Sequence, residues 1–173
     1  MQVTHEHSNS PLVISIPHSG TDIPQDIAPL CNLAAKREHT DWALQELVLQ
    51  LFETTLIATV SRYIVDVNRF KPRVGKATQP IIPRIDEVGH QLFNNYPSKQ
   101  KQADWLEQYY MPYYLHLENL LNEKSEQHER VLLVDLHSYD DTLFGTSDII
   151  LGTRKKQTLS PDTLEKLQIL FHE

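Results

Sequence analysis

Short apolar, β-branched runs alternate with helix-like stretches along the chain. Leu12–Ile16 is an apolar run that stops at a proline, a pattern typical of a buried strand. Thr40–Phe52 repeats apolar residues at the spacing of one helical face, and Thr40 is a suitable N-cap. Leu56–Val60 and Tyr63–Val67 are two further strand-like runs. The first part of the chain therefore predicts a strand, a helix and two strands.

The middle of the chain begins with a proline-rich stretch. Residues Lys71–Ser98 contain four prolines and little periodicity, so we expect a long loop. Ala103–Leu121 returns to a helical pattern, and Pro112 within it should kink the helix.

The last part of the chain predicts two strands and a helix. Val131–Leu136 is the clearest buried strand by its pattern, and Asp148–Leu151 resembles another. Ser160 as N-cap and Pro161 at the first helical position then begin a final helix. Alternating strands and helices predict an α/β fold, with a mainly parallel or mixed sheet and helices on both faces. At 173 residues we expect a single domain over residues 1–173.

Composition narrows the classes of function. The net charge of −7 disfavours binding to nucleic acid, which depends on Lys and Arg neutralising phosphates. The sequence shows neither an apolar run of about 20 residues, as a membrane span needs, nor a secretory signal. We therefore expect no membrane partner and a cytoplasmic location. Cys31 is the single cysteine, so the nine histidines are the main source of soft metal ligands.

Polar groups follow three of the predicted strands. His18 follows the first after one proline, Asn68 and Arg69 follow the Tyr63–Val67 run, and His137 follows the Val131–Leu136 run. In open α/β sheets ligands bind beyond the carboxyl ends of the strands, so we expect these groups to form one site.

The candidate residues suit a zinc site. A catalytic zinc takes three protein ligands, commonly two histidines and a carboxylate, and His18 and His137 would supply the nitrogens. Asp135 shares a strand face with His137 and could lie beside it without binding the metal. The third ligand stays open between Asp22, four residues after His18, and Asp41, at the start of the first long helix.

A substrate can also be inferred from the residues. The planar guanidinium of Arg69 can hold a carboxylate through two hydrogen bonds, and Asn68 adds an amide donor. A metal that polarises a carbonyl and lowers the pKa of bound water, beside such a clamp, indicates hydrolysis of a small N-acyl amino acid.

Four ordered motifs resemble those of the N-formylglutamate amidohydrolase family. They are VISIPHSGTDIP, RYIVDVNRF, LLVDLHS and SDIILGTR, and they extend from about Leu12 to the end of the chain. Their order is also similar to that of the aspartoacylase and succinylglutamate desuccinylase group, zinc enzymes related to the carboxypeptidases. The resemblance implies a phosphorylase/hydrolase-like fold, one zinc ion and hydrolysis of N-formylglutamate, as in histidine degradation.

Residue by residue, the resemblance makes His18 and His137 metal ligands and gives the substrate carboxylate to Asn68 and Arg69. The aspartoacylase group has a metal-binding glutamate where this chain has Thr21, so that ligand does not transfer. The N-formylglutamate amidohydrolase family typically has an aspartate at the position of Asp41, which favours Asp41 over Asp22 as third ligand.

Two departures from the family pattern concern catalysis. Relatives often have a histidine after the Pro-Tyr of the central helix, where this chain has Tyr114. Relatives also continue beyond the equivalent of residue 173 and supply a late glutamate as general base. From this we expect a C-terminally truncated domain that self-associates through its exposed surface. The alternative function is an inactive relative that folds and binds metal or ligand.

Overall fold

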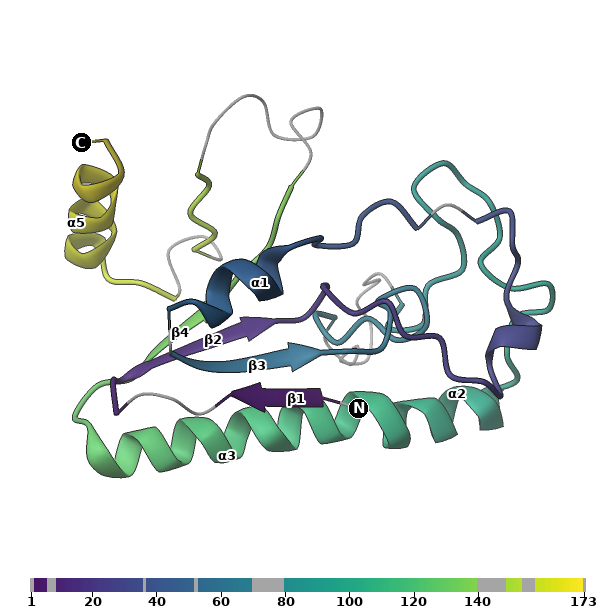
Figure 1. Cartoon of the computed structure of the whole chain (residues 1–173), viewed down its shortest axis with the longest axis horizontal. Coiled ribbons are helices and arrows are strands. Elements are labelled where there is room, and N and C mark those ends of the chain that lie inside the picture. Colours follow the sequence, from purple (N-terminus) through teal and green to yellow (C-terminus); the bar gives the residue numbers. More distant parts are fainter. Residues whose placement is uncertain are drawn as a thin grey trace. The chain divides into compact units, whose positions relative to one another are not determined.

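The computed structural model describes residues 2–5, 9–35, 37–51, 53–69, 80–139, 149–153 and 158–172. The chain divides into two compact units, Met1–Ser138 and Tyr139–Glu173. The first unit contains a sheet and most of the helices (Figure 1). The expectation of a single domain stays a prediction.

The first unit is built on a four-stranded sheet. Its spatial order is β1-β3-β2-β4, formed by Gln2–His5, Thr54–Ala58, Leu12–Ile16 and Leu132–Asp135. Strand β2 pairs in parallel with both β3 and β4, whereas β1 pairs antiparallel with β3. The predicted α/β class with a mixed, mainly parallel sheet is therefore confirmed.

Side-chain alternation along β2 divides its residues between the two faces of the sheet. Ile14 and Ile16 pack with Ile57 of β3 and Val48 of helix α1 (Leu44–Leu49). Ser15, between them in sequence, lies against the opposite helix and contacts its Tyr113. Figure 1 shows α1 and the long helix α3 (Met111–Gln127) on opposite sides of the sheet, which agrees with the prediction of helices on both faces.

The long helix is continuous in the ribbon but changes its hydrogen-bonding pattern (Figure 1). Helix α2 (Lys99–Trp105) leads into a π-helical turn, η2 (Leu106–Tyr110), and then into α3 (Met111–Gln127). The Met111 N–H donates to the Leu106 carbonyl, and Pro112 falls in the first turn of α3. A π turn is a recognised way for a helix to accommodate a local break in its i→i−4 ladder.

The predicted strand Tyr63–Val67 is wrong. Residues 62–64 form a turn in which Ile64 N–H donates to the Ser61 carbonyl, and Asp66 N–H donates to the Ile81 carbonyl. The apolar residues of this run are nevertheless buried in the larger core, which is why the run resembled a strand. A short apolar run reports burial more reliably than it reports secondary structure.

The predicted helix Thr40–Phe52 is shortened in the described residues to α1, Leu44–Leu49. Thr40 is not the N-cap; its hydroxyl donates to the Arg37 carbonyl, and Ala43 takes the cap position in the left-handed region. The Asp41 N–H donates to the His18 carbonyl, so residues before α1 are tied to the loop after β2 instead of to the helix.

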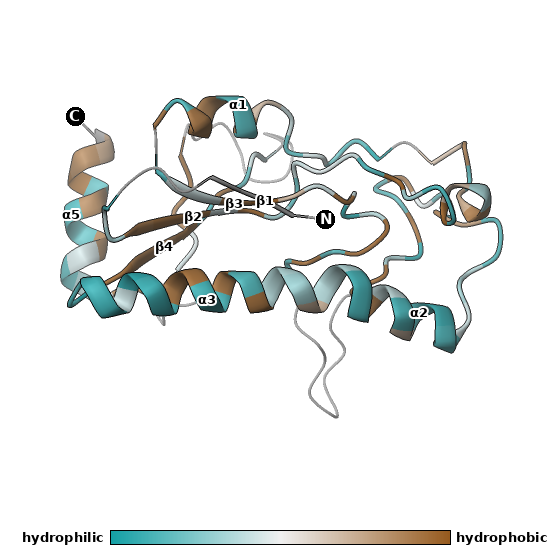
Figure 2. Ribbon diagram, turned by 60° about the horizontal axis from the view of Figure 1, so that its bottom comes forward, coloured by the Kyte–Doolittle hydropathy of each residue, from teal (hydrophilic) through white to brown (hydrophobic). Residues whose placement is uncertain are grey.

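Strand β4 is the least buried strand whose side chains are described, although its sequence predicts the clearest buried one. Figure 2 shows β4 as a hydrophobic ribbon, yet Leu132 and Leu133 are 45% and 40% exposed. Within the described residues β4 pairs on one side only, with β2, which explains the exposure. Whether this edge leads to self-association stays a prediction.

The second unit contains helix α5 (Pro161–His172). The Ser160 Oγ accepts a hydrogen bond from the Thr163 N–H, as the N-cap prediction requires. Of the predicted strand Asp148–Leu151, residue 148 lies outside the described residues, and residues 149–151 are not in a strand. Among the described residues, none of the helices is both long and apolar enough to span a bilayer.

Candidate metal centre

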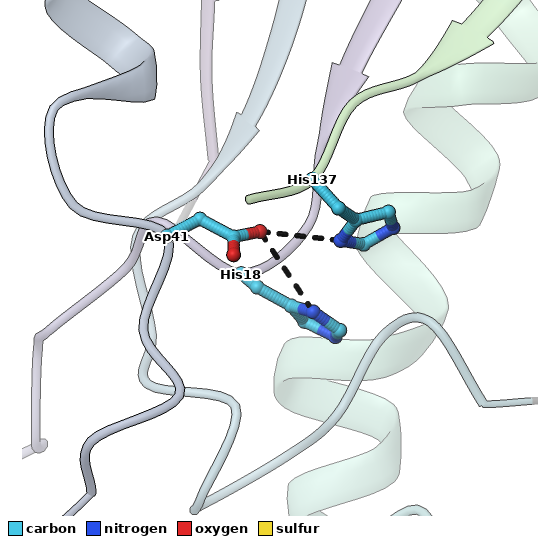
Figure 3. A group of neighbouring side chains, drawn as sticks. All are labelled: His18, Asp41 and His137. Atoms are coloured by element: carbon cyan, nitrogen blue, oxygen red, sulfur yellow. Dashed lines mark hydrogen bonds and ion pairs between the residues drawn. The ribbon is translucent and has the colours of Figure 1, made fainter. Parts of the chain in front are cut away.

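Three segments far apart in sequence bring His18, Asp41 and His137 together at the carboxyl end of the sheet. His18 lies in the loop after β2, Asp41 precedes α1, and His137 lies two residues beyond β4. One potential ligand atom from each residue lies within 4.8 Å of the others. Figure 3 shows the Asp41 carboxylate directed at both imidazole rings.

Gly20 allows the loop that carries His18 to lie close to the end of β3. A Cβ atom on Gly20 would overlap the backbone carbonyl of Thr59. Two residues later the Asp22 N–H donates to that same carbonyl over 3.0 Å. Only glycine fits so close a backbone approach, and the contact sets the height of His18 above the sheet.

The two oxygens of Asp41 have different partners. The Oδ1 atom accepts hydrogen bonds from the Ser138 N–H and hydroxyl, at 3.2 and 2.8 Å. The Oδ2 atom faces the imidazoles, 3.1 Å from His137 Nδ1 and 3.9 Å from His18 Nδ1. Ser138 therefore fixes the carboxylate and leaves one oxygen directed into the cluster.

His18 is also held by a neighbouring residue, through Nε2, the ring nitrogen that does not face Asp41. Its Nε2 lies 2.8 Å from Asp66 Oδ1, and a carboxylate can only accept, so Nε2 carries the proton. The Nδ1 atom is then left with a lone pair, and it accepts from Arg62 over 3.0 Å. His18 is 4% exposed, and burial, partly offset by the contact with Asp66, lowers its pKa.

His137 is the most accessible of the three, with a side chain 30% exposed. Its Nε2 lies 3.0 Å from Asn68 Nδ2 and 3.5 Å from Asp135 Oδ2. Burial alone would lower its pKa, but hydrogen bonds to Asp135 and Asp41 and the charges of both raise the pKa to about 9. Without a metal, His137 is therefore a cation at neutral pH.

The carboxylates of the cluster remain ionised despite their burial. Burial opposes ionisation of Asp41, but hydrogen bonds from His137 and Ser138 outweigh it and lower its pKa. Asp66 behaves likewise: the hydrogen bond from His18 and the nearby positive charges outweigh burial and lower its pKa. Both carboxylates therefore present anionic oxygens to the imidazoles, and Asp66 also pairs with the positive charges of Arg62 and Arg69.

The structure places both predicted substrate-binding residues beside the cluster. Asn68 contacts His137 directly, as described above. Arg69 Nε lies 3.3 Å from Asp66 Oδ2, and the Arg69 side chain is 32% exposed. Tyr110 and Tyr114 of the long helix donate to the carbonyls of Arg69 and Val67, at 2.7 and 2.8 Å, and thereby hold this loop in place.

Sequence reasoning missed Arg62 and Asp66. Arg62 contacts both His18 and Asp66, with 3.1 Å between its second terminal nitrogen and Asp66 Oδ2. Asp66 lies within the run that predicted a strand and Arg62 directly before it, and alternation would have placed both on one face without a role. Their i, i+4 spacing was the available signal, because it suits a helical turn better than a strand.

The two remaining candidates, Asp22 and Asp135, differ in their position relative to the cluster. Asp22 is exposed and pairs through its backbone with Val60, so of the two aspartates considered, Asp41 is the one in the cluster. Asp135 lies beside His137, as the shared strand face predicted.

Two imidazoles and a carboxylate are a suitable donor set for zinc. Each of the three also has its other polar atom held by a neighbour: Asp66 for His18, Ser138 for Asp41, and Asn68 with Asp135 for His137. Such partners orient metal ligands in established sites. Fold and site together define an α/β protein with a candidate mononuclear metal centre at the ends of parallel strands.

Comparison with known proteins places the chain in a family. The model of the family described as N-formylglutamate amidohydrolase matches residues 10–173, and the chain belongs to that family. It is 30% identical to the N-formylglutamate deformylase of Pseudomonas aeruginosa over 175 aligned positions, covering 91% of this chain and 65% of the relative. The chain thus spans slightly less than two thirds of that curated relative.

A solved structure supports the fold. The crystal structure of N-formylglutamate amidohydrolase from Ralstonia eutropha JMP134 superimposes with a TM-score of 0.69. The match covers 95% of this chain and 70% of the other, at 21% sequence identity.

Proposed function

We propose that the chain is a zinc-dependent amidohydrolase that cleaves the amide bond of an N-acyl acidic amino acid, with N-formylglutamate as the first candidate. Family membership supports the reaction class, and the P. aeruginosa relative is named as an N-formylglutamate deformylase. The proposal of a metal rests on the convergence of His18, Asp41 and His137. Each of these side chains is also held by a neighbouring residue through its other polar atom.

His18, Asp41 and His137 would hold the zinc ion. Zinc in such a site supplies Lewis-acid chemistry, polarising the scissile carbonyl and acidifying water. The protein residues around it fix the ligand atoms and set the local charge. The Arg62 guanidinium lies beside His18, and its positive charge would stabilise negative charge that develops on a carbonyl oxygen bound near the metal.

Arg69 would bind the substrate carboxylate. Its guanidinium is one-third exposed and anchored through Nε to Asp66, so the terminal nitrogens can form two parallel bonds to a carboxylate. Asn68, next to it and in contact with His137, would set the distance between the carboxylate and the acyl carbon. This arrangement selects acidic or free-carboxylate substrates.

The second candidate function is binding of metal or ligand without turnover. One observation favours it: among the described residues, the carboxylates in contact with the cluster, Asp41, Asp66 and Asp135, are each engaged with a histidine. Among the described residues we therefore identify no general base.

The experiment that tests the proposal measures zinc content and N-formylglutamate hydrolysis on the same samples. The wild-type chain is compared with His137→Ala and with His128→Ala, a histidine at the end of α3, as matched control. We expect about one zinc per chain, lost in His137→Ala and kept in His128→Ala. Zinc with turnover supports the enzyme, zinc without turnover supports the second candidate, and a folded wild type without zinc contradicts both metal proposals.

The role of Arg69 is tested separately through substrate preference. In Arg69→Lys the charge stays but the paired hydrogen bonds are lost, so we expect KM for N-formylglutamate to rise about tenfold with zinc content unchanged. N-formyl amino acid amides, which lack the α-carboxylate, should be affected far less. An equal loss for both substrates would contradict a carboxylate-binding role for Arg69.

A further inference from the structure

A chain of buried hydroxyl groups extends from helix α3 to the metal centre. The Ser15 Oγ lies 2.8 Å from the Tyr113 hydroxyl and 2.6 Å from Asp135 Oδ1. Ser15 and Tyr113 are both 2% exposed. The other oxygen of Asp135 lies 3.5 Å from His137 Nε2. Three elements, α3, β2 and β4, therefore contribute to one hydrogen-bonded series that ends on a candidate ligand.

The sheet register makes this series possible. Ser15 of β2 pairs directly with Asp135 of β4, and alternation places both side chains on the face covered by α3. A buried serine between Ile14 and Ile16 has no packing advantage over alanine or valine. The Ser15 hydroxyl can be buried there because it is hydrogen-bonded to both Tyr113 and Asp135.

The direction of the hydrogen bonds follows from their chemistry. The Asp135 carboxylate can only accept, so Ser15 donates to it and must accept from the Tyr113 hydroxyl. The other oxygen of Asp135 lies 3.5 Å from His137 Nε2 and can only accept, so this contact favours a hydrogen on Nε2 and leaves Nδ1 for the metal. The Asn68 amide, also near Nε2, can present either its oxygen or its nitrogen and imposes no choice.

We infer that Ser15 and Tyr113 are positioning residues for the metal centre: they hold Asp135 so that it orients His137 with Nδ1 towards Asp41. The inference rests on the proposed zinc site and extends it to residues in the core of the sheet. Asp135 needs such support because its side chain is 43% exposed, on a strand that pairs on one side only within the described residues. Without Ser15, the carboxylate could turn outward to solvent.

The test is zinc affinity, measured by competition with a chromophoric chelator. Outer-shell partners of a ligand typically contribute about 10–100-fold in affinity. We expect Asp135→Ala to lose affinity within that range, Ser15→Ala to lose about threefold to tenfold as a more distant member, and Tyr113→Phe to lose less. The effect of Ser15→Ala should vanish in the Asp135→Ala background, because the relay is already broken there.

Thr55→Val is the matched control, since it removes another fully buried hydroxyl of the same sheet, one that donates to the Glu53 carbonyl. It should lower stability without changing zinc affinity. The imidazole nitrogen chemical shifts of His137 in the zinc-loaded protein give a second readout, expected to change in Ser15→Ala.

The outcomes are distinguishable. Equal zinc affinity in wild type and Ser15→Ala, or a loss that persists in the Asp135→Ala background, overturns the relay while the proposed function stands. A folded wild type that binds no zinc overturns the proposed function and the relay with it.

Discussion

Asp41 and His137 are 96 positions apart in the chain, yet Asp41 Oδ2 lies 3.1 Å from His137 Nδ1. Two backbone contacts create this proximity. The Leu136 N–H donates to the Ser15 carbonyl and extends the β2–β4 ladder towards His137, while the Asp41 N–H donates to the His18 carbonyl. The cluster is therefore a consequence of sheet register, because a slip of one residue would turn His137 to the other face.

Asp41→Asn should reduce zinc affinity by more than about 100-fold, a larger loss than for an outer-shell partner. The amide keeps the size of the side chain but removes the anionic oxygen that faces both imidazoles. Chelator competition at fixed pH measures the change. Asp22→Asn is the control, since that exposed carboxyl lies outside the cluster and its loss should leave affinity unchanged. The reverse ranking would make Asp22 the ligand.

The proximity of His18 and His137 could be predicted because each lies two residues beyond a strand that the apolar pattern indicates. His18 and His137 come after β2 and β4, and parallel strands that pair bring such residues together. Asp41 needed the family resemblance, because at the residue level it competed with Asp22.

Arg62 and Asp66 could not be predicted in the same way. They lie in and just after a turn whose burial resembles that of a strand, and their contacts with His18 join residues more than 40 positions apart in the chain. The exposure of β4 could not be predicted either, because an apolar run has the same pattern at the edge of a sheet as in its centre.

Gly20→Ala should destabilise the fold. The added Cβ would overlap the Thr59 carbonyl, so the His18 loop or the end of β3 must shift. Such overpacking costs about 1–3 kcal/mol, measurable as a lower midpoint in urea unfolding. Gly152→Ala is the matched control, because a Cβ there meets nothing within 4 Å and should change stability little. Equal stability of both variants would contradict the close approach.

Arg62→Met should increase zinc affinity. The guanidinium donates to the His18 nitrogen that a metal would use, and its charge repels a cation. Removing one positive charge a few ångströms from the ion corresponds to about tenfold or more in affinity at the partly screened dielectric of such a site. Arg84→Met, which removes an arginine stacked on Tyr96, is the control and should have no effect. Weaker zinc binding in Arg62→Met would show that Arg62 supports the site by holding Asp66.

Zinc binding should displace a proton from His137 and therefore depend on pH. Its pKa of about 9 means that His137 is a cation at pH 7, paired with Asp41 and Asp135, and the metal needs the neutral ring. Zinc affinity should rise about tenfold per pH unit between pH 7 and 9 and then level off. The pKa is raised above its usual value of 6.5, so the stability that the charged ring gives the metal-free chain is present below pH 6.5 and is lost as pH rises through 9. His137→Gln should remove this decline in the metal-free chain, as urea unfolding across the pH series would measure. A wild-type affinity that does not change with pH would contradict the charged state of His137.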